Sequence, residues 1–307
     1  MVEHRGFTFD PSAQLIVSED PYVLQMVERL LGDNLHWQIG TAWTYSNGVY
    51  VRDAVGDVRF AYPMRGGFQA LMDGFLPLLA GELRHHAEVC SIQPRQRRAR
   101  LTDGSTYRYD ALVSTLPLPQ LIQAIGEQAP QEIRCAAKGL RHASMRCVHL
   151  GVARPNLSDK HWLHYPNGAV FHRVFMQGNA SAACNAPGGF ALTCEIDYST
   201  SRPLPAEDDA LIAHCIDDCR RVGLLDASDR VLVANQVDLP LAHVVCDCAS
   251  AQHVARIRAW LAQHDIVLAG GYAEWQPYNW ERALIAGKHA ADTALHGASA
   301  SPQAMTA

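Results

Sequence analysis

The stretch DIVLAGGYAEWQPYNWERALIAGKHAADTAL, residues 265–295, decides the fold. Its first part, residues 266–269, predicts a short apolar strand that runs directly into Gly270 and Gly271. An aromatic and acidic turn follows, and then a helix with a face of small residues. This order is typical of the end of a nucleotide-binding domain, which usually opens with a GxGxxG turn. The sequence contains no such opening turn.

Bulk composition indicates an ordinary globular protein. The chain has 307 residues, of which 48% are hydrophobic and 19% charged, and its formal net charge is −5. This length predicts one large domain or two interlocked domains, and we favour two. No apolar run approaches the roughly 20 residues that cross a bilayer. The N-terminus has no signal-peptide core, so we expect a cytoplasmic protein without a membrane span.

A single basic cluster, RQRRAR at residues 95–100, is the main candidate for a nucleic-acid contact. It lies just before Asp103 and Gly104, a dipeptide typical of a tight hairpin turn. We therefore interpret the cluster as a solvated hairpin arm in preference to a binding patch, and we expect no nucleic-acid partner.

Cysteine usage predicts neither a disulfide framework nor a metal site. Nine cysteines is an odd number, and they are scattered through predicted strands and helices. Cys215 and Cys219 lie four residues apart, and Cys246 and Cys248 two apart, so neither pair has the spacing typical of zinc ligands. We expect reduced, mostly buried thiols and no metal.

The first 134 residues mix helices and strands. Apolar spacing predicts a helix from Asp20 to Leu31, strand-like pieces at residues 37–45 and 49–52, and a helix after Arg65, Gly66 and Gly67 that Pro77 ends or bends. Residues 87–92 then predict a strand, 97–109 a hairpin and 111–116 a buried strand. We expect residues 112–115 and 266–269 to pair as parallel strands of one sheet.

The middle of the chain has a different residue pattern, which is typical of β-strands. Residues 146–153, 169–176, 190–198 and 230–239 alternate or are rich in β-branched and aromatic residues, as strands are. An amphipathic helix is predicted at residues 207–222, and another helix at 251–263. We therefore divide the chain into an α/β domain with a helical segment at residues 1–134 and 251–296, an inserted β-rich domain at 135–250, and a disordered tail at 297–307.

Four stretches together resemble one family. They are GFTFD at residues 6–10, YPMRGGFQAL at 62–71, YDALVSTLPLPQL at 109–121 and GGYAEWQPYNWERALIAGKHAA at 270–291. In this order they are similar to the FAD-dependent amine oxidase and protoporphyrinogen oxidase-like superfamily, with UDP-galactopyranose mutase as a neighbouring branch. The resemblance implies a mixed α/β fold in which an incomplete Rossmann-like FAD-binding domain carries a mostly antiparallel β-sheet substrate domain.

The resemblance also implies a set of FAD contacts. In this family the glycine pair lets the backbone approach the cofactor closely, and a helix N-terminus adds positive potential beside the pyrophosphate. The positions that match the family's cofactor-binding motifs are Asp10, Arg65, Gly66, Gly67, Val89, Thr115, Leu116, Gly270, Gly271, Tyr272 and Trp275.

Three departures from the family concern FAD contacts. The opening βαβ unit with its GxGxxG turn is absent, which predicts an abnormal edge where its first strand would lie. Pro11 follows Asp10 where the family has a glycine pair, and Gly271 stands where the family has an arginine. Three explanations stay open: a start site placed too late, a second polypeptide that completes the FAD-binding sheet, and loss of the flavin.

The expected function is an N-terminally truncated FAD-dependent oxidoreductase that oxidises or isomerises a small molecule, such as a sugar or a secondary metabolite. The alternative is a flavin-free relative that binds a ligand or a partner protein through its β-rich domain. Flavin would perform the redox chemistry, so no catalytic side chain is assigned. Candidate substrate contacts in and beside the β-rich domain are His161, Trp162, Tyr165, His172, Arg173, Glu195, Tyr198 and His243. Arg173 either faces an anionic substrate group or pairs with Glu195 on an adjacent strand.

Overall fold

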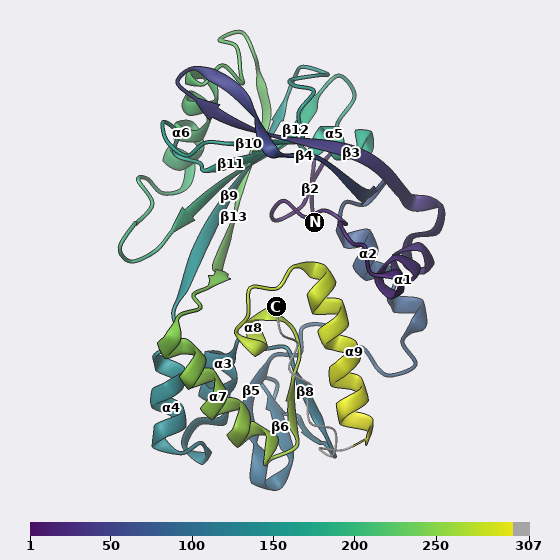
Figure 1. Cartoon of the computed structure of the whole chain (residues 1–307), viewed down its shortest axis with the longest axis vertical. Helices are drawn as coiled ribbons and strands as arrows, with labels where there is room; N and C mark the ends of the chain where they lie inside the picture. The colour runs from purple at the N-terminus through teal and green to yellow at the C-terminus, as the bar shows by residue number, and fades with distance from the viewer. Residues whose placement is uncertain (297–307) are drawn as a thin grey trace. The chain divides into compact units, whose positions relative to one another are not determined.

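A computed structural model describes residues 1–296 of the chain, apart from the side chains of residues 54, 55 and 296. The expected disordered tail, residues 297–307, lies outside the described residues. The chain forms two compact units, one of residues 1–80 and 143–242 and the other of residues 81–142 and 243 onward. Each unit is built from two separate pieces of chain (Figure 1).

Unit 1 contains a seven-stranded sheet with the order β13-β9-β12-β11-β10-β3-β4. Its strands are β3 (Leu35–Ser46), β4 (Val49–Pro63), β9 (His142–Val152), β10 (Trp162–His164), β11 (Arg173–Phe175), β12 (Phe190–Tyr198) and β13 (Val231–Val244). Every register given is antiparallel except that of β10 with β3, which is parallel. The sheet is therefore mostly antiparallel, as the strand patterns of residues 135–250 predicted.

Smaller elements complete unit 1. They are β1 (Val2–His4), β2 (Phe7–Phe9), α1 (Pro21–Leu31), α2 (Gln69–Asp73), α5 (Gln177–Ala180), α6 (Asp208–Arg221) and the short 3-10 helices η1 (Gly32–Asn34), η2 (Leu76–Leu78) and η5 (Ala182–Cys184). The predicted helix at 20–31 is confirmed as α1, where the Asp20 carboxylate accepts hydrogen bonds from the amides of Tyr22 and Val23. Pro77 lies in η2, so the predicted interruption of the helix after Gly67 is also confirmed.

Two apolar clusters hold the two faces of the large sheet. One face packs against α6, with Leu150, Leu192, Cys215 and Cys219 among the buried side chains (Figure 1). The other face packs against β2, where Phe7 and Phe9 join a cluster that includes Phe60 and Tyr62 of β4. Burial of these large side chains is the main stabilising contribution to unit 1.

Unit 2 contains two small sheets and the long helices. A meander is formed by β5 (Val89–Gln93), β6 (Arg98–Leu101) and β7 (Thr106–Arg108), and a parallel pair by β8 (Leu112–Ser114) and β14 (Ile266–Leu268). The helices are α3 (Leu118–Ile125), α4 (Gln131–Lys138), α7 (Cys248–Ala262), α8 (Gly271–Glu274), α9 (Trp280–His296) and the 3-10 helices η3 (Pro94–Gln96) and η4 (Gly126–Gln128). The predicted hairpin at 97–109 and the predicted parallel pairing are both confirmed.

The compact units divide the chain at other points than the expected domain boundaries. Residues 1–80 fall into the unit of the large sheet, because β3 and β4 extend that sheet through the pairing of β3 with β10. The sequence pattern of a strand does not identify its partner, so the expectation grouped these residues with the nearby α/β segment.

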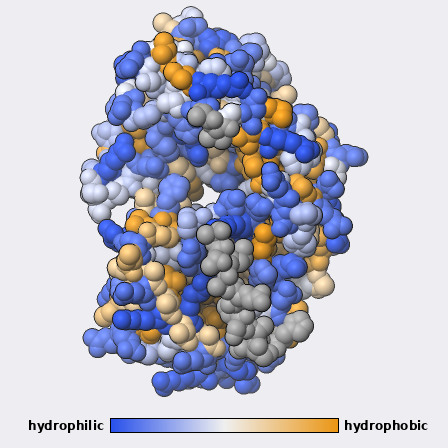
Figure 2. All heavy atoms as spheres, in the orientation of Figure 1, coloured by the Kyte–Doolittle hydropathy of each residue, from blue (hydrophilic) through white to orange (hydrophobic). Residues whose placement is uncertain are grey.

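The surface is mostly hydrophilic on the face that Figure 2 shows, with hydrophobic residues in scattered groups. All nine cysteines are unpaired, and five of them are buried. Among the helices of residues 1–296, none combines the length and the apolar character that a membrane crossing requires.

Candidate functional site

The first candidate site lies in unit 2, where the parallel strands β8 and β14 end side by side. The register pairs Leu268 with Ser114, and the Ala269 amide donates a 3.0 Å hydrogen bond to the Ser114 carbonyl. The predicted cofactor residues Thr115 and Leu116 follow β8, and Gly270 and Gly271 follow β14. The structure therefore brings these four residues to one end of one sheet, which is where α/β folds bind their ligands.

Gly270 and Gly271 shape the turn after β14 for different reasons. Gly270 has φ +90°, and an added Cβ would meet no atom within 4 Å. An added Cβ at Gly271 would lie 2.8 Å from the carbonyl oxygen of Gln276. Gly271 is thus required by packing, whereas Gly270 combines a positive φ with open space beside the backbone.

The helix expected directly after the glycine pair begins later in the structure. Residues 271–274 form only the short helix α8, and a loop leads from there to α9, which begins at Trp280. The N-terminus of the long helix is therefore separated from Gly271 by eight residues of chain. The turn contains Trp275 in the left-handed region, with φ +55°, and this interruption has no signature in the apolar spacing.

Two buried polar groups at this end of the sheet have no hydrogen-bond partner. Trp275 is 1% exposed, and its indole Nε1–H is unpartnered within the described residues. The Ser114 hydroxyl on β8 is likewise buried without a partner there. Leaving such donors unpaired costs free energy, so a bound group with acceptor atoms would be stabilised at either one.

Glu274 is a nearby residue that the sequence interpretation missed. The residue is 8% exposed, and its carboxylate accepts hydrogen bonds from Arg258 at 3.0 Å and from the Tyr278 hydroxyl at 3.1 Å. These contacts tie α8 to α7 and to the loop before α9. The signal available in the sequence was a lone acidic residue inside an aromatic turn.

A pocket of ≈ 870 Å³ lies along β14. All three residues of β14 line it, together with apolar residues of α9 that include Ile285, Ala286 and Ala290. Parallel pairing alternates along a strand, so the bonds of Asp265 and Ala269 to β8 leave the amide and carbonyl groups of Ile266 and Leu268 directed away from β8. Neither residue has a backbone partner there within residues 1–296.

Asp10 and the Arg65–Gly67 segment belong to unit 1. Asp10 is 1% exposed, and its carboxylate accepts hydrogen bonds from the Tyr62 hydroxyl and, at 2.9 Å, from the Phe68 amide. Burial raises the pKa of Asp10, and these two hydrogen bonds oppose that shift. An added Cβ at Gly67 would lie 2.6 Å from the carboxylate. Asp10 therefore fixes the loop that contains Gly66 and Gly67.

The backbone of Arg65 is also fixed, because its amide and carbonyl bond the Asn34 side chain at 3.0 Å each. The Arg65 side chain is exposed. Val89 begins β5 in unit 2 and is half-buried. The FAD contacts assigned to Asp10, Arg65, Gly66, Gly67 and Val89 stay predictions.

A second candidate site is a polar row across the large sheet of unit 1. The register places Glu195 opposite Arg173, Arg173 opposite His164, and His164 opposite Thr44, so the four side chains share one face. Arg173 Nε donates to Glu195 Oε2 at 2.5 Å, and Glu195 is fully buried. Of the two alternatives for Arg173, the structure therefore shows the pairing with Glu195 on the adjacent strand.

His164 and Asp53 extend this row and were not predicted. His164 Nε2 lies 3.9 Å from Asp53 Oδ2, and Thr44 Oγ1 donates to Asp53 Oδ1 at 2.5 Å. Burial lowers the pKa of His164, and the Asp53 carboxylate opposes that shift. The available signal was a set of polar residues at alternate positions in apolar strands, which the sequence reasoning noted only for Arg173.

Other predicted substrate residues have different surroundings. Trp162 packs against the rings of Phe60 and Phe175, and Tyr165 is a core residue whose hydroxyl lies 3.0 Å from that of Tyr50. The Tyr198 hydroxyl donates to Asp238 at 2.7 Å.

The three predicted histidines do not form one cluster. The Thr41 amide donates to His161 Nδ1 at 3.4 Å, and His172 lies 3.6 Å from Asp197. His243 is exposed near the end of β13, in unit 2. Over the described part of the chain, no three His, Cys, Asp or Glu side chains gather as metal ligands would.

Comparison with known proteins identifies the relatives of this fold. The family model described as flavin containing amine oxidoreductase matches residues 3–295. The solved structure of reduced UDP-galactopyranose mutase is similar at a TM-score of 0.88 and 16% identity, over 96% of this chain and 85% of that chain.

Two further solved structures are similar over a smaller share of their own length. A protein from Exiguobacterium sp. 255-15, provisionally named protoporphyrinogen oxidase, has a TM-score of 0.62 at 15% identity, over 80% of this chain and 54% of that chain. The CLA-producing fatty acid isomerase from P. acnes has a TM-score of 0.56 at 12% identity, over 75% of this chain and 52% of that chain. At these identities the likeness is one of fold, a mixed α/β fold of the FAD-dependent oxidoreductase type.

Proposed function

Because the chain belongs to the flavin containing amine oxidoreductase family, we propose that it binds FAD and acts as a flavin-dependent oxidoreductase or isomerase on a small molecule. The observation that carries this proposal is the open space beside Gly270 at the carboxyl end of β14. A backbone without a Cβ, next to the end of a parallel strand, can approach a flat or phosphorylated ligand closely.

The residues at this end of the sheet fit such a cofactor. Gly270 would allow its close approach, and the unpartnered Trp275 Nε1–H and Ser114 hydroxyl would donate hydrogen bonds to its oxygen or nitrogen atoms; Gly271 stays a proposed contact by resemblance. Thr115, Leu116 and Tyr272 would surround it, and Asp10, Arg65, Gly66, Gly67 and Val89 stay proposed contacts by resemblance. When bound, FAD would supply the redox chemistry, and the protein would supply orientation and exclusion of water.

The polar row of unit 1 supports a polar substrate, such as a sugar or a secondary metabolite. Arg173 keeps 30% of its side-chain surface exposed although its Nε is engaged by Glu195, so its remaining N–H groups are available to a ligand oxygen. His164 has its pKa lowered by burial, which favours the neutral imidazole. A neutral imidazole offers one donor and one acceptor to a hydroxyl group.

We also propose that a second polypeptide completes the cofactor sheet. The amide and carbonyl groups of Ile266 and Leu268 are directed away from β8, and apolar residues of α9 line the pocket along β14. An extended segment that pairs with this edge would satisfy the backbone groups. Copurification and crosslinking at β14 would test whether such a partner exists in the cell.

The experiment that tests flavin binding is purification of the full chain followed by denaturation and measurement of released flavin. We expect a yellow protein with about one flavin per chain, and we expect Gly270→Val to lose it because a β-branched residue at φ +90° is strained and fills the open space. Gly223→Val is the control, since Gly223 has φ +74° and open surroundings in unit 1. A folded protein that stays colourless after incubation with FAD would reject the proposal.

One observation favours a second candidate, a flavin-free relative that binds a ligand or a partner protein through the β-rich sheet. The Asp10 carboxylate, a predicted cofactor contact, is already engaged by Tyr62 and Phe68 within the protein. A colourless protein with a folded large sheet would be the expected result under this alternative.

A further inference from the structure

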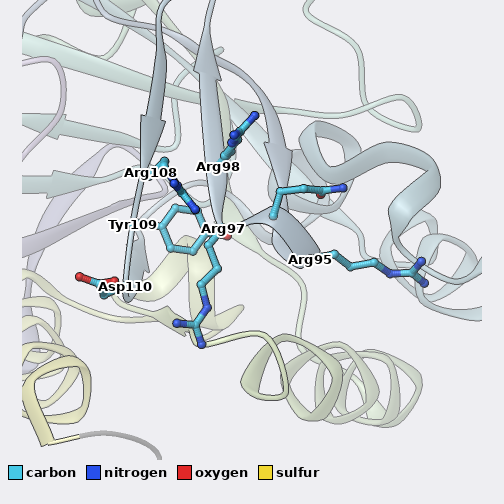
Figure 3. A pocket seen from close by; sticks show the side chains of 7 residues that line it. Arg95, Arg97, Arg98, Arg108, Tyr109 and Asp110 are labelled. Atoms are coloured by element: carbon cyan, nitrogen blue, oxygen red, sulfur yellow. The ribbon is translucent and has the colours of Figure 1, made fainter.

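A polar pocket of ≈ 620 Å³ lies on the meander sheet of unit 2, at the segment whose sequence predicts a solvated hairpin arm. It is lined by Arg95 from η3, by Arg97 and Arg98 at the start of β6, and by Arg108, Tyr109 and Asp110 at the end of β7. Figure 3 shows these side chains emerging from the two adjacent strands and the preceding turn. Four arginines and one carboxylate give the pocket a strong positive charge in a chain whose net charge is −5.

Arg98 and Arg108 face each other across the hairpin. The register pairs Arg98 with Arg108 directly, so two positive charges occupy one cross-strand site. Like charges in this position are destabilising. Within residues 1–296, neither guanidinium has a carboxylate at ion-pair distance, and in Figure 3 the two groups point apart. A bound anion beside this pair would offset the repulsion.

Arg97 and Tyr109 form the next cross-strand contact and line the same pocket. The Tyr109 amide donates a 3.1 Å hydrogen bond to the Arg97 carbonyl, and the Arg97 guanidinium pairs with Asp265. Arg97 has φ +50°, so the chain enters β6 in the left-handed region. The Tyr109 hydroxyl is buried and has no partner in the described part of the chain. This buried donor is a second observation, independent of the charges, that points to a missing acceptor.

We propose that this pocket binds a small phosphorylated molecule, with its dianionic phosphate contacted by the Arg108 guanidinium and the unpartnered Tyr109 hydroxyl that line the pocket. Guanidinium groups donate paired hydrogen bonds that match the oxygen atoms of a phosphate, and they have no acceptor atoms of their own. The volume is within the range of small-molecule sites and leaves space for the organic part of a phosphate ester. Because the lining is polar and open to solvent, recognition depends on charge and is weakened by salt.

The test uses the full chain and isothermal titration calorimetry at low ionic strength, with inorganic phosphate and glycerol 3-phosphate as probes. Arg108→Gln should weaken binding of both probes about tenfold, because it removes one charge-assisted contact. Arg256→Gln is the matched control. Arg256 is an exposed residue of α7 that does not line the pocket, and the control should change binding less than about twofold.

Thermal unfolding provides a second readout that does not depend on a single variant. Without phosphate, Arg108→Gln should unfold at the same temperature as the wild type or higher, because the like-charge pair is relieved. With phosphate, only the wild type and Arg256→Gln should gain stability. A lower midpoint for Arg108→Gln in phosphate-free buffer would contradict the proposed repulsion.

Three results would overturn the site: no binding of either probe to the wild type, equal weakening by Arg108→Gln and Arg256→Gln, or binding of a single-stranded oligonucleotide that both variants weaken alike. The last two would indicate general attraction of polyanions to the surface. Flavin content is measured on the same samples. Phosphate binding that fails in a yellow protein rejects this site alone, and phosphate binding in a colourless protein supports the site without the flavin proposal.

Discussion

Asp10 shows how one buried carboxylate can fix a loop. It accepts hydrogen bonds from Tyr62 and Phe68, and its own amide donates to Gln177 at 3.3 Å. The segment that follows Pro63 is therefore anchored to β2 by side-chain contacts and not by a strand pairing. Only glycine fits at position 67 in this arrangement.

Gly67→Ala should destabilise the protein by roughly 3 kcal/mol, because it combines strain at φ +59° with a 2.6 Å approach to Asp10. Gly168→Ala is the control, since Gly168 has φ +85° but no atom within 4 Å of an added Cβ. It should cost only about 1 kcal/mol. Urea unfolding measures both free energies, and equal losses would show that the contact with Asp10 does not matter.

His149 is the most deeply buried histidine among the side chains that the structure describes. It is fully buried, stacks on Phe9 with ring centroids 5.1 Å apart, and its Nδ1 lies 2.7 Å from the Asn235 side-chain oxygen. The oxygen requires a proton on Nδ1, so the neutral ring fits with hydrogen on that nitrogen. Burial lowers the pKa of His149.

The lowered pKa of His149 predicts a stability that depends on pH. The unfolded state binds the proton more tightly, so stability is fully present above about pH 6.5, the unfolded pKa, and is lost as the pH falls below it. His161 and His164, whose pKa values are also lowered by burial, add to the same trend. Urea unfolding at pH 7.5 and 5.5 should show a smaller pH effect in His149→Gln than in the wild type. The exposed-residue control His4→Gln should keep the wild-type pH effect; an unchanged effect in His149→Gln would refute the assignment.

Site residues could be predicted from the sequence only where a local pattern marks them. The glycine pair at 270 and 271 follows a recognisable strand, and Arg173 with Glu195 was one of two stated alternatives. His164 and Asp53 were missed because they meet only through the register of β10, β3 and β4. The spacing of residues along the sequence does not reveal such a long-range contact.

Elements were predicted best where one periodicity dominates. The bounds of helix α1, of the hairpin of β6 and β7 and of strand β14 were predicted to within a few residues. The strands β3 and β4 are longer than expected and join at Asn47 and Gly48, which have φ +51° and +85°. An Asn-Gly turn of this kind is a strong hairpin signal that would have revealed the full length.

The free edge of β14 predicts an alternating pattern of hydrogen exchange. The amides of Val267 and Ala269 point to β8 and should exchange slowly, whereas those of Ile266 and Leu268 point away from β8 and should exchange faster. Native-state exchange resolved to single amides measures this. Uniform slow exchange along β14 would show that another segment occupies the edge.

At the scale of the whole molecule, the family match and the fold of FAD-dependent oxidoreductases agree, while the substrate is a proposal. Fold class could be predicted because four motifs recur in order along the chain. The division into units could not, because it depends on the parallel contact of β3 with β10, whose residues lie about 120 positions apart in sequence.

A bound cofactor should stabilise the whole chain by mass action. FAD at 100 times its dissociation constant should raise the free energy of unfolding by about 2.7 kcal/mol. Thermal unfolding with and without FAD measures the shift, and riboflavin, which lacks the phosphates and the adenosine, should give a smaller one. If FAD and riboflavin shift the midpoint equally, the nucleotide half of the cofactor makes no contact.

Because each unit is built from two separate pieces of chain, neither unit can finish folding on the ribosome until its second piece has been synthesised. The large sheet has all of its strands only after residue 244 has emerged, and β8 must wait for β14, some 150 residues later. At synthesis rates of roughly 5–20 residues per second, the nascent β8 segment spends on the order of ten seconds without its neighbour. A chaperone that shields residues 112–116 during that interval would raise the yield of native protein more than one that acts after release.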